Sequence, residues 1–182
     1  MESLDDLLAQ AEHYAEFCMR KSGNLSPTLF LVGEEGPLVF APSSLTDNHQ
    51  KDDFATTSRL LCVAHAATLV VMALEAWVKF AKPDEKLDLT EQPSEAFDRQ
   101  EVIVLMGESY SGQKQKFLPI IRSDNGKFFG FDENNAPGMD KMEGRFAGIL
   151  SPKTPTAENR ALAKTVLKIK GFSWLVAKNL KA

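Results

Sequence analysis

The sequence predicts an α+β fold of two layers, in which helices pack on one face of a mainly antiparallel sheet. Apolar residues recur at three- and four-residue steps near both ends of the chain, which is typical of amphipathic helices. Between residues 68 and 132 the apolar residues alternate with a period of two instead. Because strands follow one another there without intervening helices, we expect an N-terminal hairpin and a four-stranded meander and not parallel βαβ units.

Composition places the chain among ordinary globular proteins. Of its 182 residues, 43% are hydrophobic and 25% are charged. This profile excludes a disordered chain, a collagen and a disulfide scaffold. The acidic N-terminus does not resemble a signal peptide, so we expect a cytoplasmic protein without a transmembrane segment. We expect one α+β domain over residues 1–150 and a basic helix with an amphipathic tail over 151–182.

The first half predicts a helix, a hairpin and a second helix. Residues 3–21 carry one apolar stripe, with Ser3 as N-cap and Ser22-Gly23 as the stop. Short apolar runs at 28–32 and 38–40 flank a glycine-bounded turn and predict a β-hairpin. A second helix is expected from about Gln50 to His65.

The second half begins with a change of period. Residues 68–80 alternate and predict a long strand, although continuation of the second helix is the main alternative because Ala, Leu and Met favour helices. After a polar loop at 82–97, the runs 101–109, 113–122 and 127–132 are joined by turn signals and complete the meander. Pro119 predicts an edge position or a bulge in the middle run.

The C-terminal part predicts further helical segments. We expect a short helix over Met142–Leu150 and a last helix from about Thr156, interrupted at Gly171. In the tail, Phe172, Leu175 and Val176 share one helical side, and together with Trp174 they form an apolar extension. Phe172, Trp174 and Leu175 are therefore candidate interaction residues.

The candidate ligand-binding residues flank the long loop. Antiparallel neighbours at 68–80 and 101–109 would bring both ends of the loop to one end of the sheet. Clustered carboxylates there could act as acid and base or hold a cation. A structural network in which Arg99 bridges the carboxylates is the other interpretation, and the more frequent one. The candidates are Glu75, Trp77, Glu95, Asp98, Arg99 and Glu101.

The same segment resembles a known group of sequences. Glu75-Ala76-Trp77, a spacer, and then the pattern Pro-Ser-Glu-x-x-Asp-Arg-Gln-Glu at 93–101 before an apolar strand resemble a set of uncharacterised bacterial and phage-type proteins. The resemblance covers about residues 25–150. It implies the fold and no activity, and it assigns no catalytic residue.

Other chemistry has little support in the sequence. Cys18 and Cys62 lie in helical patterns without a metal-binding spacing, so we expect buried free thiols. His65 ends a helix on its apolar side and is expected to be a core or helix-terminus histidine. Phosphate-binding glycine loops and a nucleophile elbow are absent from the sequence. We therefore predict no metal and no cofactor, and leave open whether the protein is an enzyme.

Charge is unevenly distributed along the chain. Residues 153–182 hold seven basic residues and one acidic residue, for a net charge of +6, whereas residues 1–152 carry a net charge of −10. Either the basic part lies on the acidic body, or it contacts nucleic acid, anionic lipid or an acidic partner. The acidic body makes nucleic acid an improbable partner.

Three functions remain open from these observations. The favoured one is a non-enzymatic module that assembles with itself or with a protein partner through a sheet edge or the tail. The first alternative is a small enzyme or ligand-binding protein with an acidic pocket under the loop 82–98. The second is contact with an anionic surface or nucleic acid through the basic tail.

Overall fold

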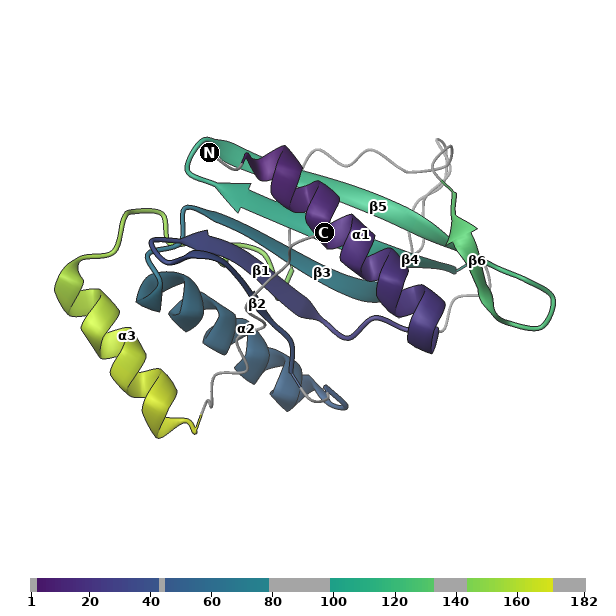
Figure 1. Cartoon of the computed structure of the whole chain (residues 1–182). Coiled ribbons are helices and arrows are strands. Elements are labelled where there is room, and N and C mark those ends of the chain that lie inside the picture. The colour runs from purple at the N-terminus through teal and green to yellow at the C-terminus, as the bar shows by residue number, and fades with distance from the viewer. Residues whose placement is uncertain (1–2, 43–44, 79–98, 133–143, 172–182) are drawn as a thin grey trace, which may run out of the picture.

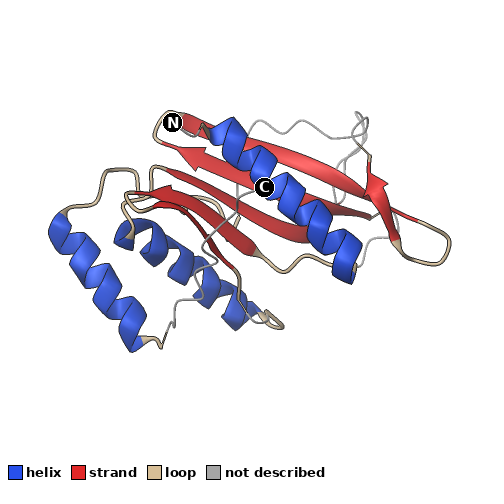
Figure 2. Cartoon of the chain, in the orientation of Figure 1, coloured by secondary structure: helices blue, strands red, loops and turns tan. Residues whose placement is uncertain are grey.

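The fold is an antiparallel sheet with helices, as the sequence predicts. The computed structural model describes residues 3–42, 45–78, 99–132 and 144–171. In these ranges the elements follow in the order α1 (Leu4–Ser22), β1 (Thr28–Gly33), β2 (Gly36–Phe40), α2 (Asn48–Ala64), β3 (Leu69–Val78), β4 (Gln100–Ser109), β5 (Gly112–Arg122), β6 (Phe128–Phe131) and α3 (Ala157–Ile169). Figure 1 labels them, and Figure 2 shows the division into helices and strands.

One six-stranded sheet unites the hairpin and the meander. Its strand order is β2-β1-β3-β4-β5-β6, and every neighbouring pair is antiparallel. The strand after α2 therefore returns beside β1, with Phe30 opposite Val71. The alternation at 68–80 is confirmed as a strand over Leu69–Val78, and the helical alternative for this segment is wrong.

The helices are divided between the two faces of the sheet. Apolar α1 side chains pack on the β3 and β4 residues of one parity, including Val71 and Ile103. The helix α2 packs on residues of the other parity, including Val70 and Val104. Both parities of β3 and β4 are apolar, so each face needs a cover. The α+β class is confirmed, with the refinement that α1 covers one face while α2 and α3 lie on the other (Figure 1).

Local signals explain the helix ends. Ser3 caps α1: its hydroxyl accepts from the Asp6 N–H at 3.1 Å, and the Asp6 carboxylate accepts from the Ser3 N–H at 2.9 Å. Gly23, with φ of 75°, ends the helix in the left-handed conformation that glycine adopts without strain. Thr156 caps α3, close to the predicted start.

Pro119 lies where the pairing of β5 changes. Its carbonyl accepts from the Asp132 N–H at 2.9 Å, but the proline ring has no N–H to return. The pairing of β5 with β6 begins at Ile120, and the register shifts between Ile121 and Arg122. The expected bulge is therefore two residues beyond the proline.

The short helix predicted for Met142–Leu150 is wrong over its described part, residues 144–150. Turns and bends replace it. Gly144 and Gly148 have φ of 116° and 62°, values that an α-helix cannot accommodate. The backbone of this segment is held by side chains from other elements, as described below.

Candidate functional site

Those predicted site residues that the structure describes lie close together. They are at one end of the sheet, on the face that α1 covers. Trp77 of β3 lies directly opposite Glu101 of β4. Glu75 lies two residues before Trp77 on the same face of β3, and Arg99 lies just before β4. Glu95 and Asp98 lie outside the described residues. Of the six predicted residues, four are therefore placed, and the antiparallel pairing of β3 with β4 explains why they converge.

The central contact of this cluster is an ion pair between Glu101 and Arg122. Arg122, the last residue of β5, donates from Nε to Glu101 Oε2 at 2.7 Å and from Nη2 to Glu101 Oε1. The two bonds run in parallel, which is the strong geometry for a guanidinium and a carboxylate. The pair is shielded, since the Glu101 side chain is only 12% exposed. Arg122 lowers the pKa of Glu101 below its usual value by hydrogen bonding to its carboxylate.

Arg122 also ties the end of α1 to the sheet. Its Nη2 donates to the Gly23 carbonyl at 3.2 Å, and its Nη1 donates to the Gly126 carbonyl at 3.3 Å. The guanidinium thus links three segments: the exit of α1, strand β4 and the turn after β5. This residue was missed at the sequence level, where Arg99 was the expected bridge.

Glu75 fastens the chain that follows α1. Its Oε2 accepts from the Leu25 N–H at 3.0 Å. Burial raises the pKa of the Glu75 carboxyl above its usual value, the Leu25 N–H opposes this shift, and the neighbouring Glu101 adds to it. Two neighbouring carboxyls therefore shift in opposite directions, because only Glu101 has the guanidinium as a direct partner.

Trp77 and Arg99 form a stacked pair at the margin of the cluster. The Arg99 guanidinium carbon lies 4.6 Å from the centroid of the Trp77 ring, within the range of a cation–π interaction. The Trp77 residue remains 42% exposed. Arg99 thus contacts an aromatic face, while Arg122 makes the bonds to Gly23, Glu101 and Gly126 described above.

The chemistry of this cluster is mainly that of a structural network. Glu101 is held by Arg122, and Glu75 holds a backbone N–H. In the described ranges no group of three or more His, Cys, Asp or Glu side chains is arranged to hold a metal ion. The arrangement supports the structural interpretation of the cluster, while the raised pKa of Glu75 is the feature that a proton-transfer role would need.

A second buried carboxylate was missed by the sequence analysis. Glu108 of β4 is 4% exposed, and its two oxygens accept from the N–H groups of Ile149 and Leu150, each at 3.0 Å. From α2, Arg59 donates to the carbonyls of residues 145, 147 and 148 at 3.0–3.3 Å. These bonds replace the helical ones expected for this segment, and no sequence spacing relates the residues that make them.

The two cysteines and His65 differ in burial and in partners. Both cysteines are free thiols, and Cys62 is buried as expected, whereas Cys18 is partly exposed. Burial raises the pKa of the Cys62 thiol, which disfavours the reactive thiolate. His65 is the C-cap residue of α2, and burial lowers its pKa despite Glu35, whose Oε2 lies 3.9 Å from Nδ1.

Two basic residues, one in α3 and one at its C-terminal end, form ion pairs with acidic residues of the body. Arg160 pairs with Glu34 in the turn between β1 and β2, and Lys170 pairs with Asp53 of α2. This supports the intramolecular account of the charge asymmetry for these two residues. The predicted interaction residues Phe172, Trp174 and Leu175 lie outside the described residues.

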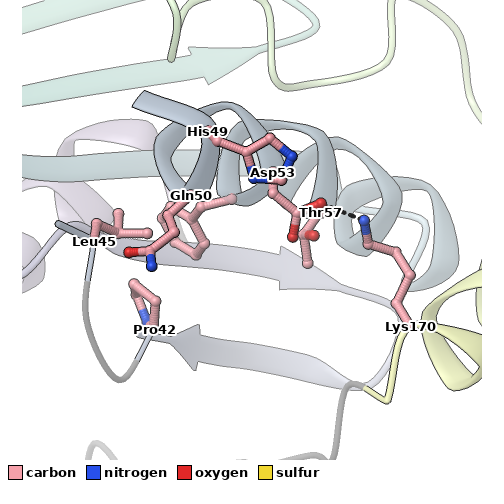
Figure 3. Close-up of a pocket in the computed structure, with 8 residues that line it drawn as sticks. Pro42, Leu45, His49, Gln50, Asp53, Thr57 and Lys170 are labelled. Carbon is pink, nitrogen blue, oxygen red and sulfur yellow. Dashed lines mark hydrogen bonds and ion pairs between the residues drawn. The ribbon is translucent and has the colours of Figure 1, made fainter. Parts of the chain in front are cut away.

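A pocket of about 240 Å³ lies between α2 and the chain that follows β2 (Figure 3). Its lining comes from both of these segments and from the end of α3. The lining residues are Pro42, Leu45, His49, Gln50, Asp53, Phe54, Thr57 and Lys170. Nothing in the sequence pattern pointed to this pocket, since it depends on how α2 and α3 pack together.

Comparison with known proteins adds no family. The chain matches no family model, no curated protein and no solved structure. The resemblance noted from the segment 75–101 therefore stays a prediction. Of the helices described, α1, α2 and α3, none has both the length and the apolar composition required to span a bilayer.

Proposed function

We propose that this protein is a non-enzymatic interaction module that associates with a second copy of itself through the outer side of α3. The observation that carries the proposal is the exposure of two large apolar side chains on this helix. Leu162 is 63% exposed and Ile169 is 80% exposed. They are seven residues apart and therefore lie on the same side of the helix, with Val166 between them.

This apolar stripe is separate from the stripe that holds α3 to the molecule. Ala163 and Leu167 are 3% and 0% exposed and pack in the core with α2. A helix that buries one apolar stripe and exposes another is typical of a surface that binds a partner. Figure 1 shows α2 between α3 and the sheet, so that among the described helices α3 is the outermost on this face.

A second copy fits this stripe because the stripe is self-complementary. In a two-fold dimer each patch meets an identical patch. If two α3 helices pack antiparallel about their midpoint, Leu162 of one copy lies beside Ile169 of the other. A helix of 13 residues is about 20 Å long, so the contact is smaller than a standard interface and predicts a weak dimer.

The cluster at the end of the sheet supports a role without catalysis. The carboxylate of Glu101 is bound by Arg122, and Glu75 Oε2 is bound by the Leu25 N–H. These hydrogen bonds, together with the bond from Arg122 to the Gly23 carbonyl, connect the end of α1 to β3, β4 and β5. Such connections stabilise the fold.

Light scattering over a range of protein concentrations tests the proposal. We expect the average mass of the wild-type chain to rise with concentration. The double variant Leu162→Glu with Ile169→Glu should remain monomeric, because it places like charges opposite each other. The matched control is Phe17→Glu, which changes a residue that is 56% exposed on α1 and should leave the association intact.

Two outcomes would count against self-association through α3. A wild-type chain that is monomeric at every concentration would reject the dimer. A dimer that survives the double variant but is lost when Phe172, Trp174 and Leu175 are replaced by Ala would move the interface to the tail.

A ligand-binding role is the second candidate, favoured by one observation. The partly exposed Trp77 lies near Glu75, whose pKa burial raises. The exposed part of the Trp77 ring could stack on a small molecule with an aromatic group, and a neutral Glu75 carboxyl could hydrogen-bond to it. A thermal-shift screen of metal ions and metabolites tests it, and a stabilising compound should lose its effect in Glu75→Gln.

A further inference from the structure

The pocket of Figure 3 is formed by three separate segments of the chain. Most of its lining comes from α2, where residues 49, 50, 53, 54 and 57 lie on one side of the helix. Pro42 and Leu45 come from the segment after β2, and Lys170 comes from the end of α3. The Gln50 side chain also fixes the segment after β2, because its Oε1 accepts from the Thr46 N–H at 2.8 Å. Packing and hydrogen bonding thus form the pocket in advance, as is usual for small-molecule sites.

Two opposite charges stand side by side in the lining. The Lys170 ammonium group donates to the Asp53 carboxylate, and the side chains of Lys170 and Asp53 are 32% and 51% exposed. Figure 3 shows this ion pair at one side of the pocket, with Leu45 and Gln50 at the other. Because water still reaches both groups, the pair adds little to stability, and each group keeps hydrogen-bonding capacity for a ligand. A molecule in the pocket therefore meets a positive and a negative group together.

A buried hydroxyl group belongs to the same lining. Thr57 is 2% exposed, and its hydroxyl forms no hydrogen bond with the residues that the structure describes. The neighbouring Thr56 differs, since its hydroxyl donates to the Asp52 carbonyl at 2.9 Å. A buried polar group without a partner is unfavourable, and such a group in a native structure needs an explanation. A ligand that accepts from the Thr57 hydroxyl would supply the missing partner.

The size and the apolar lining of the pocket limit the ligand. The volume is about 240 Å³. Since a cavity of about 150 Å³ holds benzene, this pocket has room for about ten non-hydrogen atoms. Pro42, Leu45 and the buried Phe54 supply apolar lining, on which a compact aliphatic group would be removed from water. The ligand is thus a small molecule with a polar head and an aliphatic body.

The ion pair selects the charge of the polar head. A ligand with a single charge would be attracted by one member of the pair and repelled by the other. A zwitterion can place its ammonium group beside Asp53 and its carboxylate beside Lys170, so that each charge has an opposite neighbour and the ion pair stays intact. Free α-amino acids carry both groups on one carbon atom. Each end of a peptide brings only one of the two charges, so a peptide end satisfies this arrangement less well.

We propose that the pocket binds a free α-amino acid with a small aliphatic side chain, such as leucine. The ligand's ammonium group pairs with Asp53, and its carboxylate pairs with Lys170 and accepts from the Thr57 hydroxyl. The aliphatic side chain packs on Leu45 and Phe54. The site goes beyond the self-association proposed above. Its failure would leave that proposal intact, because the exposed apolar stripe of α3 contributes nothing to the lining.

Isothermal titration calorimetry of the full-length chain tests the site with L-leucine as the probe. We expect saturable binding of one molecule per chain. Two truncated probes carry one charge each: isocaproate lacks the ammonium group, and isoamylamine lacks the carboxylate. Both should bind at least about tenfold more weakly, because each loses hydrogen bonds between charged groups. L-Tryptophan has about half as many non-hydrogen atoms again as the pocket can hold and should not bind.

Single substitutions assign each charge of the ligand to its partner. Asp53→Asn removes the partner of the ammonium group, so leucine should bind no better than isocaproate. Lys170→Met removes the partner of the carboxylate, so leucine should bind no better than isoamylamine. These preferences would not change if the two residues only held α3 on α2. The matched controls Asp52→Asn and Lys168→Met change exposed residues outside the lining and should leave leucine binding unchanged.

Thr57→Val tests the hydroxyl without removing a charge. The substitution keeps the shape of the side chain and removes one hydrogen bond to the ligand's carboxylate, so leucine should bind several-fold more weakly. Circular dichroism during heating checks that each variant folds. The Thr57 variant decides the matter if a charge variant does not fold.

The proposal is overturned if L-leucine gives no saturable binding to the folded chain at millimolar concentration. Equal binding of leucine and both truncated probes would also reject it, because the ion pair would then play no part in selection. Binding that keeps its preferences in Asp53→Asn and Lys170→Met, or its strength in Thr57→Val, would place the amino acid elsewhere on the protein and reject this pocket.

Discussion

Glu101 and Arg122 are 21 residues apart in the sequence, yet they form a two-bond ion pair on neighbouring strands near the end of α1. Arg122 also binds the Gly23 carbonyl, so the pair connects the sheet to the helix that covers it.

We expect Glu101→Gln to lower the free energy of unfolding by about 1–3 kcal/mol. The substitution removes a charge-assisted pair and leaves a partly buried guanidinium without its carboxylate. Urea denaturation measures the loss. The control is Glu16→Gln, which breaks the exposed pair of Glu16 with Arg20 at 2.6 Å and should cost less than about 0.5 kcal/mol. Equal effects of the two substitutions would contradict the special role of the Glu101 pair.

The contributions of Glu75 and Glu101 to folding stability should depend on pH in opposite directions. The pKa of Glu75 is raised in the folded state, so its protonated form stabilises the fold, and this contribution is lost as pH rises above the unfolded value of about 4.3. Glu75→Gln, which stays neutral, should therefore gain stability relative to the wild type as pH rises from the unfolded pKa through the raised folded pKa.

The pKa of Glu101 is lowered in the folded state, so its contribution is present above the unfolded pKa and is lost as pH falls. Glu101→Gln should therefore be most destabilising at neutral pH and approach the wild type in acid. Thermal unfolding of both variants from pH 3 to pH 8 provides the measurement. If the stability of both variants relative to the wild type changed in the same direction as pH rises, the opposite pKa shifts of Glu75 and Glu101 would be contradicted.

Glu108→Gln should release the segment that contains Ile149 and Leu150. The substitution replaces one carboxylate oxygen with an amide NH2 group, which cannot accept a hydrogen bond from a backbone N–H. We therefore expect the free energy of unfolding to fall by about 2–3 kcal/mol. Hydrogen exchange at the amides of Ile149 and Leu150 should accelerate more than exchange in α1. Gln113→Ala, which changes the exposed cross-strand neighbour of Glu108, is the control and should leave both amides protected.

Gly33→Ala should be severely destabilising. A Cβ at this position would lie 2.3 Å from the backbone oxygen of His65, which also accepts from the Glu34 N–H at 3.1 Å. Because backbone atoms cannot move aside as a flexible side chain can, we expect a loss of about 3 kcal/mol. Gly130→Ala on β6 meets nothing within 4 Å and should change stability by less than about 0.5 kcal/mol, as denaturant titration would show.

Cys62 should resist thiol reagents in the folded protein. It is 1% exposed, and burial raises the pKa of its thiol, so both access and thiolate formation are disfavoured. Mass spectrometry after iodoacetamide treatment at pH 8 should find Cys18 modified first and Cys62 modified only in denaturant. Rapid labelling of Cys62 without denaturant would indicate that α2 separates readily from the sheet.

The sequence was sufficient for the described elements, apart from the helix expected at 142–150, and for part of the site. The signals for these elements act over a few residues. Ser3 and Asp6, which are three residues apart, together cap the start of α1. The alternation of β3 is visible within the single segment Leu69–Val78. The convergence of Glu75, Trp77 and Glu101 follows from this parity once β3 and β4 are neighbours.

The remainder depends on contacts that leave no periodic trace in the chain. Arg122 is one arginine after the apolar second half of β5, and nothing nearby in the sequence indicates that it reaches both Glu101 and Gly23. The bonds of Glu108 and Arg59 to residues 145–150 cross more than 40 residues. Pairing of β1 with β3 likewise joins two segments that α2 separates. Such relationships arise only when the elements pack.

The placement of α1 opposite α2 has a final consequence for recognition. A sheet that binds nucleic acid or a flat ligand usually offers one bare surface, on which aromatic rings stack bases. Here α1 and α2 cover the two faces of the central strands β3 and β4, so a partner would contact helix surfaces, loops or the outer strands instead. Selection for binding can therefore alter those outlying positions while the apolar interior on either side of the sheet stays as it is.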